Sequence, residues 1–394
     1  MNLLGNIFHK DSHSHKQSYD FGQVSAWPAY QLFSDIIQVL GQGGFGVVSK
    51  AHDKEANKDV AIKKVPKKSI KNREAYRRLL NFMRDDMKHP NTIHLIEWFS
   101  SSSSYYLVFE LASGGDLIDR INSAGGHLYE DEARQTITSI LQATQYLHER
   151  NVLHRDIKLD NYLYKSKEAP ASEVILIDFG QAVLLPSNDV KLLEPCGSPT
   201  YVAPEIYNYR GYSFPADMWA IGTIAFNLLS GRSLYSSANP HIIEDETKRF
   251  TDVKFNDTFW HDVSDLAKDF IRKLLTPNPV DRMTVEEALN HGWIKNVKAP
   301  QQATKKVSFT LDAHAPIARV EKGDTLRFNK GHKPDDLLDL EGSTSGEATP
   351  KQRSGSATPI PYDAKTVRER NNGDKVMLPG QLHKKLSKVV DDDS

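Results

Sequence analysis

The chain has 394 residues, of which 26% are charged, and its formal net charge is −1. This balance excludes a global attraction to nucleic acid or to a membrane surface, so charged partners must be recognised by local groups. The single cysteine excludes an internal disulfide framework and favours a reducing compartment. The sequence has no run of about 18 apolar residues, so we predict no membrane span. We expect a soluble protein of the cytoplasm, with the nucleus as a second location.

Residues 1–30 are rich in His, Ser and Lys and show no sustained hydrophobic periodicity. This composition predicts a flexible N-terminal arm. A metal site built from His9, His13 and His15 is the less favoured alternative, because these residues lack the Cys or carboxylate spacing of structural zinc sites.

Two regions of different pattern follow the arm. Between residues 31 and 110, short β-type runs alternate with turns around a single amphipathic helix, whereas residues 115–297 are mainly helical. We predict an α+β fold with a small β-rich lobe and a larger α-helical lobe, joined at Glu110-Leu111-Ala112. The main expected elements are the strands Ile36–Leu40, Val47–Ala51, Val60–Val65, Ile93–Phe99 and Tyr105–Phe109 and the helices Asn72–Met87, Glu130–Arg150, Ala216–Leu229 and His261–Leu275.

The composition changes again at about residue 298, where Pro, Gly, Ser, Thr and charged residues dominate and aromatic residues become rare. Such a segment buries too little apolar surface to offset the entropy that it would lose on ordering. We therefore predict that residues 298–394 form a largely disordered tail.

A glycine-rich segment follows the first expected strand. Glycines allow backbone N–H groups to approach phosphate oxygens, although the same residues also occur in ordinary tight hairpins. The strand Val60-Ala61-Ile62-Lys63 comes soon afterwards. A lysine on a strand is usually solvated, but one that follows a glycine hairpin is favoured as a phosphate ligand. The segment consists of Gly41, Gln42, Gly43, Gly44, Phe45 and Gly46.

The run HRDIKLDN, which spans residues 154–161, concentrates groups suited to phosphate chemistry. Asp156 can accept a proton from a hydroxyl, Lys158 can neutralise a phosphoryl oxygen, and Asn161 can bind a hard cation through its amide oxygen. Asp178, in Asp178-Phe179-Gly180, adds a carboxylate just after an apolar run.

These segments match the glycine loop, the VAIK strand, the catalytic loop and the DFG motif of protein kinases. Three later landmarks, Ala203-Pro204-Glu205, the DMWAIG run and Asp281-Arg282-Met283, follow at the usual positions. The chain resembles the eukaryotic serine/threonine kinases, for which HRDIK and the GSPTY run are typical. The stretches GGDLIDRI and CGSPTYVAPE are most similar to the calcium/calmodulin-dependent kinase group and its fungal members.

The resemblance implies a bilobal protein kinase fold and transfer of the γ-phosphoryl group of ATP, with Mg²⁺, to Ser or Thr of protein substrates. In this interpretation Asp156 accepts the hydroxyl proton, Lys158 stabilises the transferred group, and Asn161 and Asp178 bind the metal. The implied nucleotide-binding residues are Gly41, Gln42, Gly43, Gly44, Phe45, Gly46, Val48, Ala61, Lys63, Glu110, Ala112, Asp116, Leu163 and Asp178.

Within this set, backbone groups of Glu110 and Ala112 are expected at the adenine edge. The base is expected to lie between the apolar side chains of Val48, Ala61 and Leu163. Asp116 is expected at the ribose or, together with Asp160, near a basic substrate side chain. The resemblance therefore implies some preference for basic substrates, although Asn227 replaces one acidic position of that pocket.

Two structural contacts also follow from the resemblance. Ser198 is expected to bond both Asp156 and Lys158. Arg282 is expected to form a bidentate pair with Glu205, which would pin the segment after Asp178 to the lower part of the fold.

One departure from the family pattern concerns the helix of the β-rich lobe. An active kinase pairs the strand lysine with a helix glutamate. Counting nine residues back from His89 places Leu80 at that position, and the nearest acids are Glu74, Asp85 and Asp86. The departure motivates an alternative function, a nucleotide-binding pseudokinase or weakly active scaffold.

Two further expectations concern regulation. Glu194 stands where many kinases carry a phosphorylated threonine, so it could pair with Arg155 and order the segment without a phosphate. An exposed loop acid is an equally favoured alternative, because one carboxylate carries less charge than a phosphate. Residues 298–330 show no convincing amphipathic helix with basic anchors, so the tail sequence does not support control by calmodulin.

Overall fold

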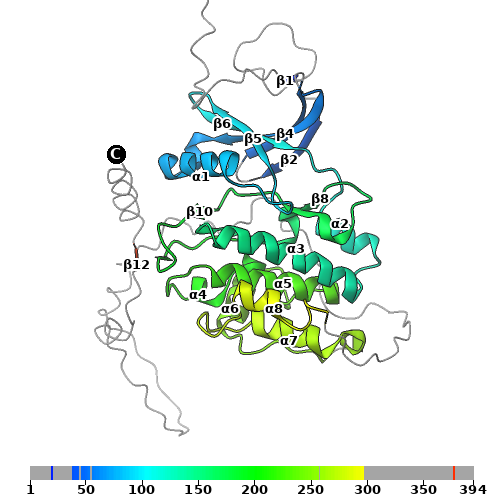
Figure 1. Ribbon diagram of the computed structural model, residues 1–394. Helices are drawn as coiled ribbons and strands as arrows, with labels where there is room; N and C mark the ends of the chain where they lie inside the picture. The colour runs from blue at the N-terminus through cyan, green and yellow to red at the C-terminus, as the bar shows by residue number, and fades with distance from the viewer. Residues whose placement is uncertain are drawn as a thin grey trace, which may run out of the picture.

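The protein is described by a computed structural model that covers residues 19–20, 38–43, 46–53, 56–256, 258–296 and 376–377. A twisted antiparallel sheet with one helix lies on a larger helical body (Figure 1). We call residues 38–110 the upper lobe and residues 115–296 the lower lobe. The predicted α+β class with two lobes is confirmed.

The upper lobe is built on a six-stranded sheet in the order β1-β3-β4-β6-β5, with β2 paired to β3. The strand β6, which lies between β4 and β5, is buried on both faces, because Tyr105, Leu107 and Phe109 face the main core while Val108 belongs to a second apolar cluster. The strands are β1 (Tyr19–Asp20), β2 (Gln38–Gly43), β3 (Gly46–Asp53), β4 (Lys58–Pro66), β5 (Leu95–Ser100) and β6 (Ser104–Glu110).

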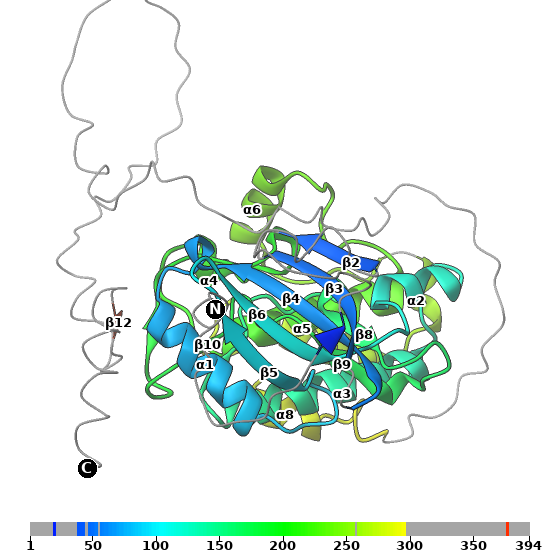
Figure 2. The same cartoon turned by 90° about the horizontal axis from the view of Figure 1, so that it is seen from above.

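The helix of the upper lobe is α1 (Arg73–Asp85), which runs beside the sheet (Figure 2). It begins at Asn72, whose side chain accepts a hydrogen bond from the backbone N–H of the third helical residue. Leu79, Leu80 and Met83 follow helical spacing and are all buried. The apolar face of α1 therefore packs into the main core.

The lower lobe is organised around α5 (Pro215–Ser230), which is buried along its whole length except for its N-terminal proline. Gly222 is required there, because a Cβ at this position would lie 2.8 Å from the Cβ of Leu274 on α7. The other helices are α2 (Leu117–Ser123), α3 (Glu130–His148), α4 (Pro204–Tyr207), α6 (Pro240–Lys248), α7 (Asp265–Leu274) and α8 (Val285–Asn290).

Short strands and 3-10 helices complete the fold. The strand pairs β7–β10 and β8–β9 are antiparallel, and β11–β12 is parallel. Their bounds are β7 (Val152–Leu153), β8 (Tyr162–Tyr164), β9 (Val174–Leu176), β10 (Val183–Leu184), β11 (Lys191–Leu192) and β12 (Val376–Met377). The 3-10 helices are η1 (Lys67–Ser69), η2 (Leu159–Asn161), η3 (Ala171–Glu173), η4 (Pro199–Tyr201) and η5 (Thr258–Asp262).

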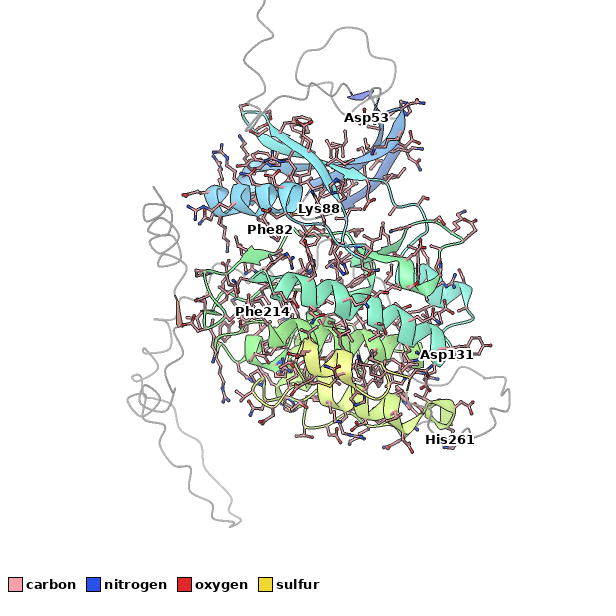
Figure 3. All side chains as sticks on the ribbon, viewed as in Figure 1. Asp53, Phe82, Lys88, Asp131, Phe214 and His261 are labelled. Atoms are coloured by element: carbon pink, nitrogen blue, oxygen red, sulfur yellow. The ribbon has the colours of Figure 1, made fainter. Side chains whose placement is uncertain are left out.

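Tyr146 of α3 ties the C-terminal end of α1 to the lower lobe. Its hydroxyl donates to the carbonyl of Asp86 and accepts from the backbone N–H of Lys88, both at 2.8 Å. Lys88 is labelled in Figure 3, where it lies at the junction of the two lobes. One end of α1 is therefore fixed by hydrogen bonds.

Most predicted elements are present, with one main difference in the lower lobe. The expected helix from His261 to Leu275 is divided into η5 and α7, because Ser264 caps α7 through the backbone N–H of Ala267. Apart from the pairs of residues in β1 and β12, the predicted arm and tail lie outside the described residues. No helix in the described part of the chain is long and apolar enough to span a membrane.

Candidate active site

Three side chains of the lower lobe form a hydrogen-bonded triangle. Ser198 Oγ donates to Asp156 Oδ1 at 2.8 Å, and Lys158 Nζ donates to Ser198 Oγ at 2.8 Å. Lys158 Nζ also lies 3.1 Å from Asp156 Oδ2. The contacts expected for Ser198 are therefore present, and both oxygens of the Asp156 carboxylate have defined partners.

The loop that carries Asp156 is held from below by Asp217 of α5. One Asp217 oxygen accepts from Arg155 N at 2.9 Å, and the other accepts from His154 N at 3.0 Å and lies 3.0 Å from His148 Nε2. Burial alone would raise the pKa of Asp217, but the hydrogen bond and charge of His148 lower it overall. Arg155 takes a positive φ of 68°, a costly conformation that this buried carboxylate stabilises.

Lys63 and Asp178 join the two lobes. Lys63 Nζ lies 2.5 Å from Asp178 Oδ1, which also accepts the backbone N–H of Gly180 at 2.8 Å. Burial alone would raise the pKa of Asp178, but the charge of Lys63 and its hydrogen bond lower it below its ordinary value. Asp178 is therefore an ionised carboxylate suited to a cation.

Lys63, Val48 and Ala61 lie on one face of the sheet. Val48 is directly opposite Lys63 in the β3–β4 ladder, and paired residues share a face, as do residues two apart on one strand. Leu163 of β8 is bridged to Asp116 in the lower lobe. The apolar residues expected around the base therefore come from both lobes.

The glycine hairpin pairs β2 with β3, with Gly41 opposite Val48, Gln42 opposite Val47 and Gly43 opposite Gly46. Gly46 has φ +135°, and a Cβ there would come 1.8 Å from a carbonyl oxygen of β4. Only glycine fits this position. The predicted ligands Gly44 and Phe45 lie outside the described residues.

The connection between the lobes leaves β6 at Glu110. The backbone N–H of Glu110 donates to the carbonyl of His94 at 3.2 Å, and its side chain accepts the backbone N–H of His94 at 3.0 Å. These bonds fix Glu110 beside β5, and Ala112 follows two residues later. Asp116 caps α2 by accepting the N–H of Asp119 at 2.8 Å.

The donor set suits Mg²⁺ and a nucleotide. Asn161 Nδ2 donates to the carbonyl of Asp156 at 2.7 Å, which leaves the amide oxygen of Asn161 available to a cation. An amide oxygen and the ionised carboxylate of Asp178 are hard ligands of the type that Mg²⁺ accepts, with phosphates and water completing the shell. Groups of three or more His, Cys, Asp or Glu that could hold a resident metal ion are absent from the described residues.

The expected pair between Glu194 and Arg155 is not present in the structure. Its carboxylate forms an ion pair with Lys71, just before α1, while Arg155 donates to the carbonyl of Gln181 at 2.6 Å. The reason is the path of the chain, because Tyr212 donates to the Glu194 carbonyl at 2.7 Å and lies between Glu194 and Arg155. The segment between Asp178 and Glu205 is thus linked to the upper lobe.

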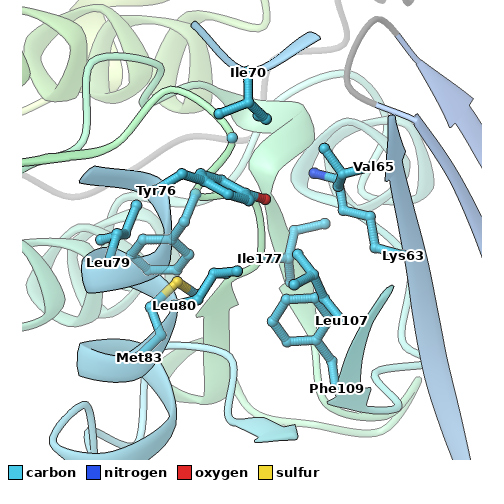
Figure 4. Close-up of a pocket in the computed structure, with 12 residues that line it drawn as sticks. Lys63, Val65, Ile70, Tyr76, Leu79, Leu80, Met83, Leu107, Phe109 and Ile177 are labelled. Carbon is cyan, nitrogen blue, oxygen red and sulfur yellow. The ribbon is translucent and has the colours of Figure 1, made fainter. Parts of the chain in front are cut away.

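Leu80 is 1% exposed and lines a pocket beside Lys63, so no carboxylate occupies the predicted glutamate position. Tyr76, which sequence reasoning missed, lines the same pocket and points its hydroxyl into it (Figure 4). The i, i+4 spacing of Tyr76 and Leu80 on one helix was the available signal.

The comparisons with known proteins agree with this geometry. The protein kinase domain family matches residues 34–294. Calcium/calmodulin-dependent protein kinase type I of Schizosaccharomyces pombe is 38% identical over 261 residues, covering 65% of this chain and 77% of that protein. A calcium/calmodulin-dependent protein kinase of Metarhizium anisopliae is 38% identical over 291 residues, 73% and 70% of the two chains. The kinase cmkA of Emericella nidulans is 36% identical over 303 residues, 75% and 68%.

Proposed function

The chain belongs to the protein kinase family and is a serine/threonine protein kinase similar to the calcium/calmodulin-dependent enzymes, and from this premise we propose how its own residues perform the transfer. Kinases of this family use ATP and Mg²⁺. The relatives reported above are all kinases by name, which favours the enzyme over the pseudokinase alternative.

In this proposal Asp156 positions the substrate hydroxyl and accepts its proton. The observation that carries the assignment is the triangle with Ser198 and Lys158, because it fixes the Asp156 carboxylate and places an ammonium beside it. Lys158 stabilises the transferred phosphoryl group. Catalysis then depends on positioning and electrostatics.

Nucleotide binding is assigned to the sheet and the connection between the lobes. Lys63 and the glycine hairpin hold the phosphates, and the backbone of Glu110 and Ala112 pairs with the base. Asn161 and Asp178 would hold Mg²⁺, which would neutralise charge on the phosphates. These assignments follow the family pattern and are supported by the ion pair of Lys63 with Asp178.

A basic-directed substrate preference is supported by two acids at the lower lobe. Asp116 and Asp160 are both half-buried, and Asp119 adds a further negative charge beside Asp116. Asn227 is buried and donates to the carbonyl of Arg232 at 2.6 Å, so it adds no charge to the pocket. We infer a modest preference for arginine upstream of the target hydroxyl.

Labelled ATP, Mg²⁺ and two serine peptides, one with an upstream arginine and one with alanine instead, test the function. We expect transfer to the arginine peptide with lower KM. Asp156→Asn should reduce the rate by about 10²–10⁴-fold while retaining nucleotide binding. Asp160→Asn should raise the KM of the arginine peptide alone. A wild-type rate equal to that of Asp156→Asn would contradict the proposal.

Two finer proposals concern regulation and location. The names of the relatives include calmodulin, but the sequence of residues 298–330 motivates activity that is independent of it. Addition of Ca²⁺ and calmodulin should leave the rate unchanged, and stimulation would overturn this inference. Location in the cytoplasm, with the nucleus as a second site, is testable by imaging of the tagged chain.

A further inference from the structure

The inner face of α1 has no acid that could pair with Lys63. Leu79 and Leu80 are 2% and 1% exposed and belong to the main apolar core. Glu74 forms an ion pair with Arg78 at 2.6 Å, and Asp85 pairs with Arg84 at 2.7 Å, and both acids are more than half exposed. The side of α1 that faces Lys63 is therefore apolar at the usual carboxylate position.

One polar group on that face remains, the hydroxyl of Tyr76. The pocket between α1 and the sheet is lined by twelve residues, and only Lys63 and Tyr76 contribute nitrogen or oxygen from a side chain. Figure 4 shows the Tyr76 hydroxyl pointing across the pocket toward the Lys63 ammonium, with Leu80 and Met83 below Tyr76 in this view. The phenol thus faces the lysine that the family pairs with a carboxylate.

The Tyr76 ring is held in place by neighbouring aromatic rings. Its centroid lies 5.3 Å from that of Tyr105, which lies 6.0 Å from that of Trp98. Burial raises the pKa of Tyr76 above its usual range, and the nearby charge of Asp178 raises it further. The hydroxyl stays protonated and can both accept from an ammonium and donate to an anion.

Lys63 can donate to more than one partner during turnover. Its ammonium now bonds Asp178, and in the proposed function that carboxylate binds Mg²⁺. An ammonium has three donors, so Lys63 can bond a carboxylate or a phosphate and still donate to a neutral acceptor. A neutral acceptor fixed on α1 would keep Lys63 aimed at the phosphates when Asp178 turns to the metal.

We propose that Tyr76 is the positioning residue for Lys63 in this kinase, accepting a hydrogen bond from its ammonium in place of a helix glutamate. The inference rests on the proposed function, since it assigns Lys63 to the phosphates of ATP. It explains how α1 contributes to the site although Leu80 replaces the usual acid.

The test is Tyr76→Phe, which removes only the hydroxyl. We expect the dissociation constant for Mg-ATP and the KM for ATP to rise about ten-fold, the effect of losing one hydrogen bond to a charged group, with kcat changed less. The melting temperature should stay near the wild-type value, because the ring keeps its contacts. The matched control is Tyr105→Phe, whose buried hydroxyl has no hydrogen-bond partner in the described part of the chain.

A carboxylate returned to the helix provides a rescue. Tyr76→Phe combined with Leu80→Glu should recover part of the ATP affinity, because residue 80 lines the same pocket. Equal ATP affinity of Tyr76→Phe, Tyr105→Phe and the wild type would overturn the positioning role. If wild-type and Asp156→Asn proteins transferred phosphate equally, the proposed function would fail instead, while the nucleotide dissociation constants would still decide the role of Tyr76.

Discussion

In the lower lobe, the groups that face the site are held by charge-assisted hydrogen bonds, whereas in the upper lobe the facing side of α1 is held by apolar and aromatic contacts. Asp217 binds two backbone N–H groups of the catalytic loop, and Arg282 binds both oxygens of Glu205 at 2.7 and 2.8 Å. Across the site, Leu79 and Leu80 occupy an apolar core.

The difference separates directional from non-directional support. Hydrogen bonds between buried charged groups specify a single geometry, because a shifted partner leaves an unsatisfied group. Apolar contacts depend on area and tolerate small rotations of a helix. The groups that perform the chemistry therefore lie in the lobe with directional support. The position of α1 depends on a few polar contacts, such as that of Tyr146 with Asp86.

The largest effect is expected on breaking the buried pair of Arg282 and Glu205, whose side chains are 0% and 3% exposed. Glu205→Gln leaves the guanidinium buried without its carboxylate, so the free energy of unfolding should fall by about 3–5 kcal/mol. Urea unfolding measures this loss of free energy. Glu244→Gln, which removes the partner of Lys248 in a partly exposed pair, is the control and should cost less than about 1 kcal/mol. Similar losses in both variants would contradict directional support in the lower lobe.

Removal of the Ser198 hydroxyl tests, through its effect on activity, the hydrogen bonds that hold Asp156 in the lower lobe. Ser198→Ala takes a donor from Asp156 and an acceptor from Lys158, so kcat should fall about ten-fold with little change in the KM for ATP. Steady-state kinetics check this. Ser139→Ala, in which a buried hydroxyl of α3 is lost, should keep the wild-type kcat. An unchanged kcat in Ser198→Ala would show that the triangle is dispensable.

Acid should weaken the lower lobe through Asp217, whose pKa lies below its ordinary value of 3.8. A lowered carboxyl pKa adds stability that is present above the ordinary value and is lost as the pH falls through the folded-state value. The free energy of unfolding should therefore decrease below about pH 4. Asp217→Asn should be less stable near neutrality but should show a shallower acid dependence in urea titrations. An equal slope in the two proteins would count against this role of Asp217.

The lower-lobe part of the site was predictable because its residues are close in sequence. Asp156, Lys158 and Asn161 lie within six positions, and the resemblance supplied their partner Ser198. Tyr76 was not found, because an aromatic residue on an amphipathic helix normally indicates core packing. The pairing of Glu194 with Lys71 spans 123 residues and depends on the path of a loop, which local patterns do not encode.

A smaller effect is expected from the polar contact between α1 and β5. Trp98 Nε1 donates to Asn81 Oδ1 at 3.1 Å, while the Trp98 ring is buried in the main core. Asn81→Ala removes this bond on the exposed side of α1, so the free energy of unfolding should fall by about 1 kcal/mol. Thermal unfolding monitors the change, with Arg77→Ala as an exposed helix control. A loss as large as that of Glu205→Gln would show that α1 also depends on directional support.

The smallest effect is expected at Glu194, although it is the acid that links the segment after Asp178 to α1. Its side chain is 41% exposed and that of Lys71 is 82% exposed, and exposed ion pairs contribute about 0–1 kcal/mol because water and salt screen them. Glu194→Gln should therefore reduce kcat/KM by no more than about five-fold at low salt, and the difference should vanish at high salt. Lys71→Gln should reproduce the effect, and the double variant should add nothing to it, since both changes remove one interaction. A large loss that persists at high salt would instead mean that the Glu194 carboxylate organises the segment in the way that a phosphate does, through buried groups around Arg155.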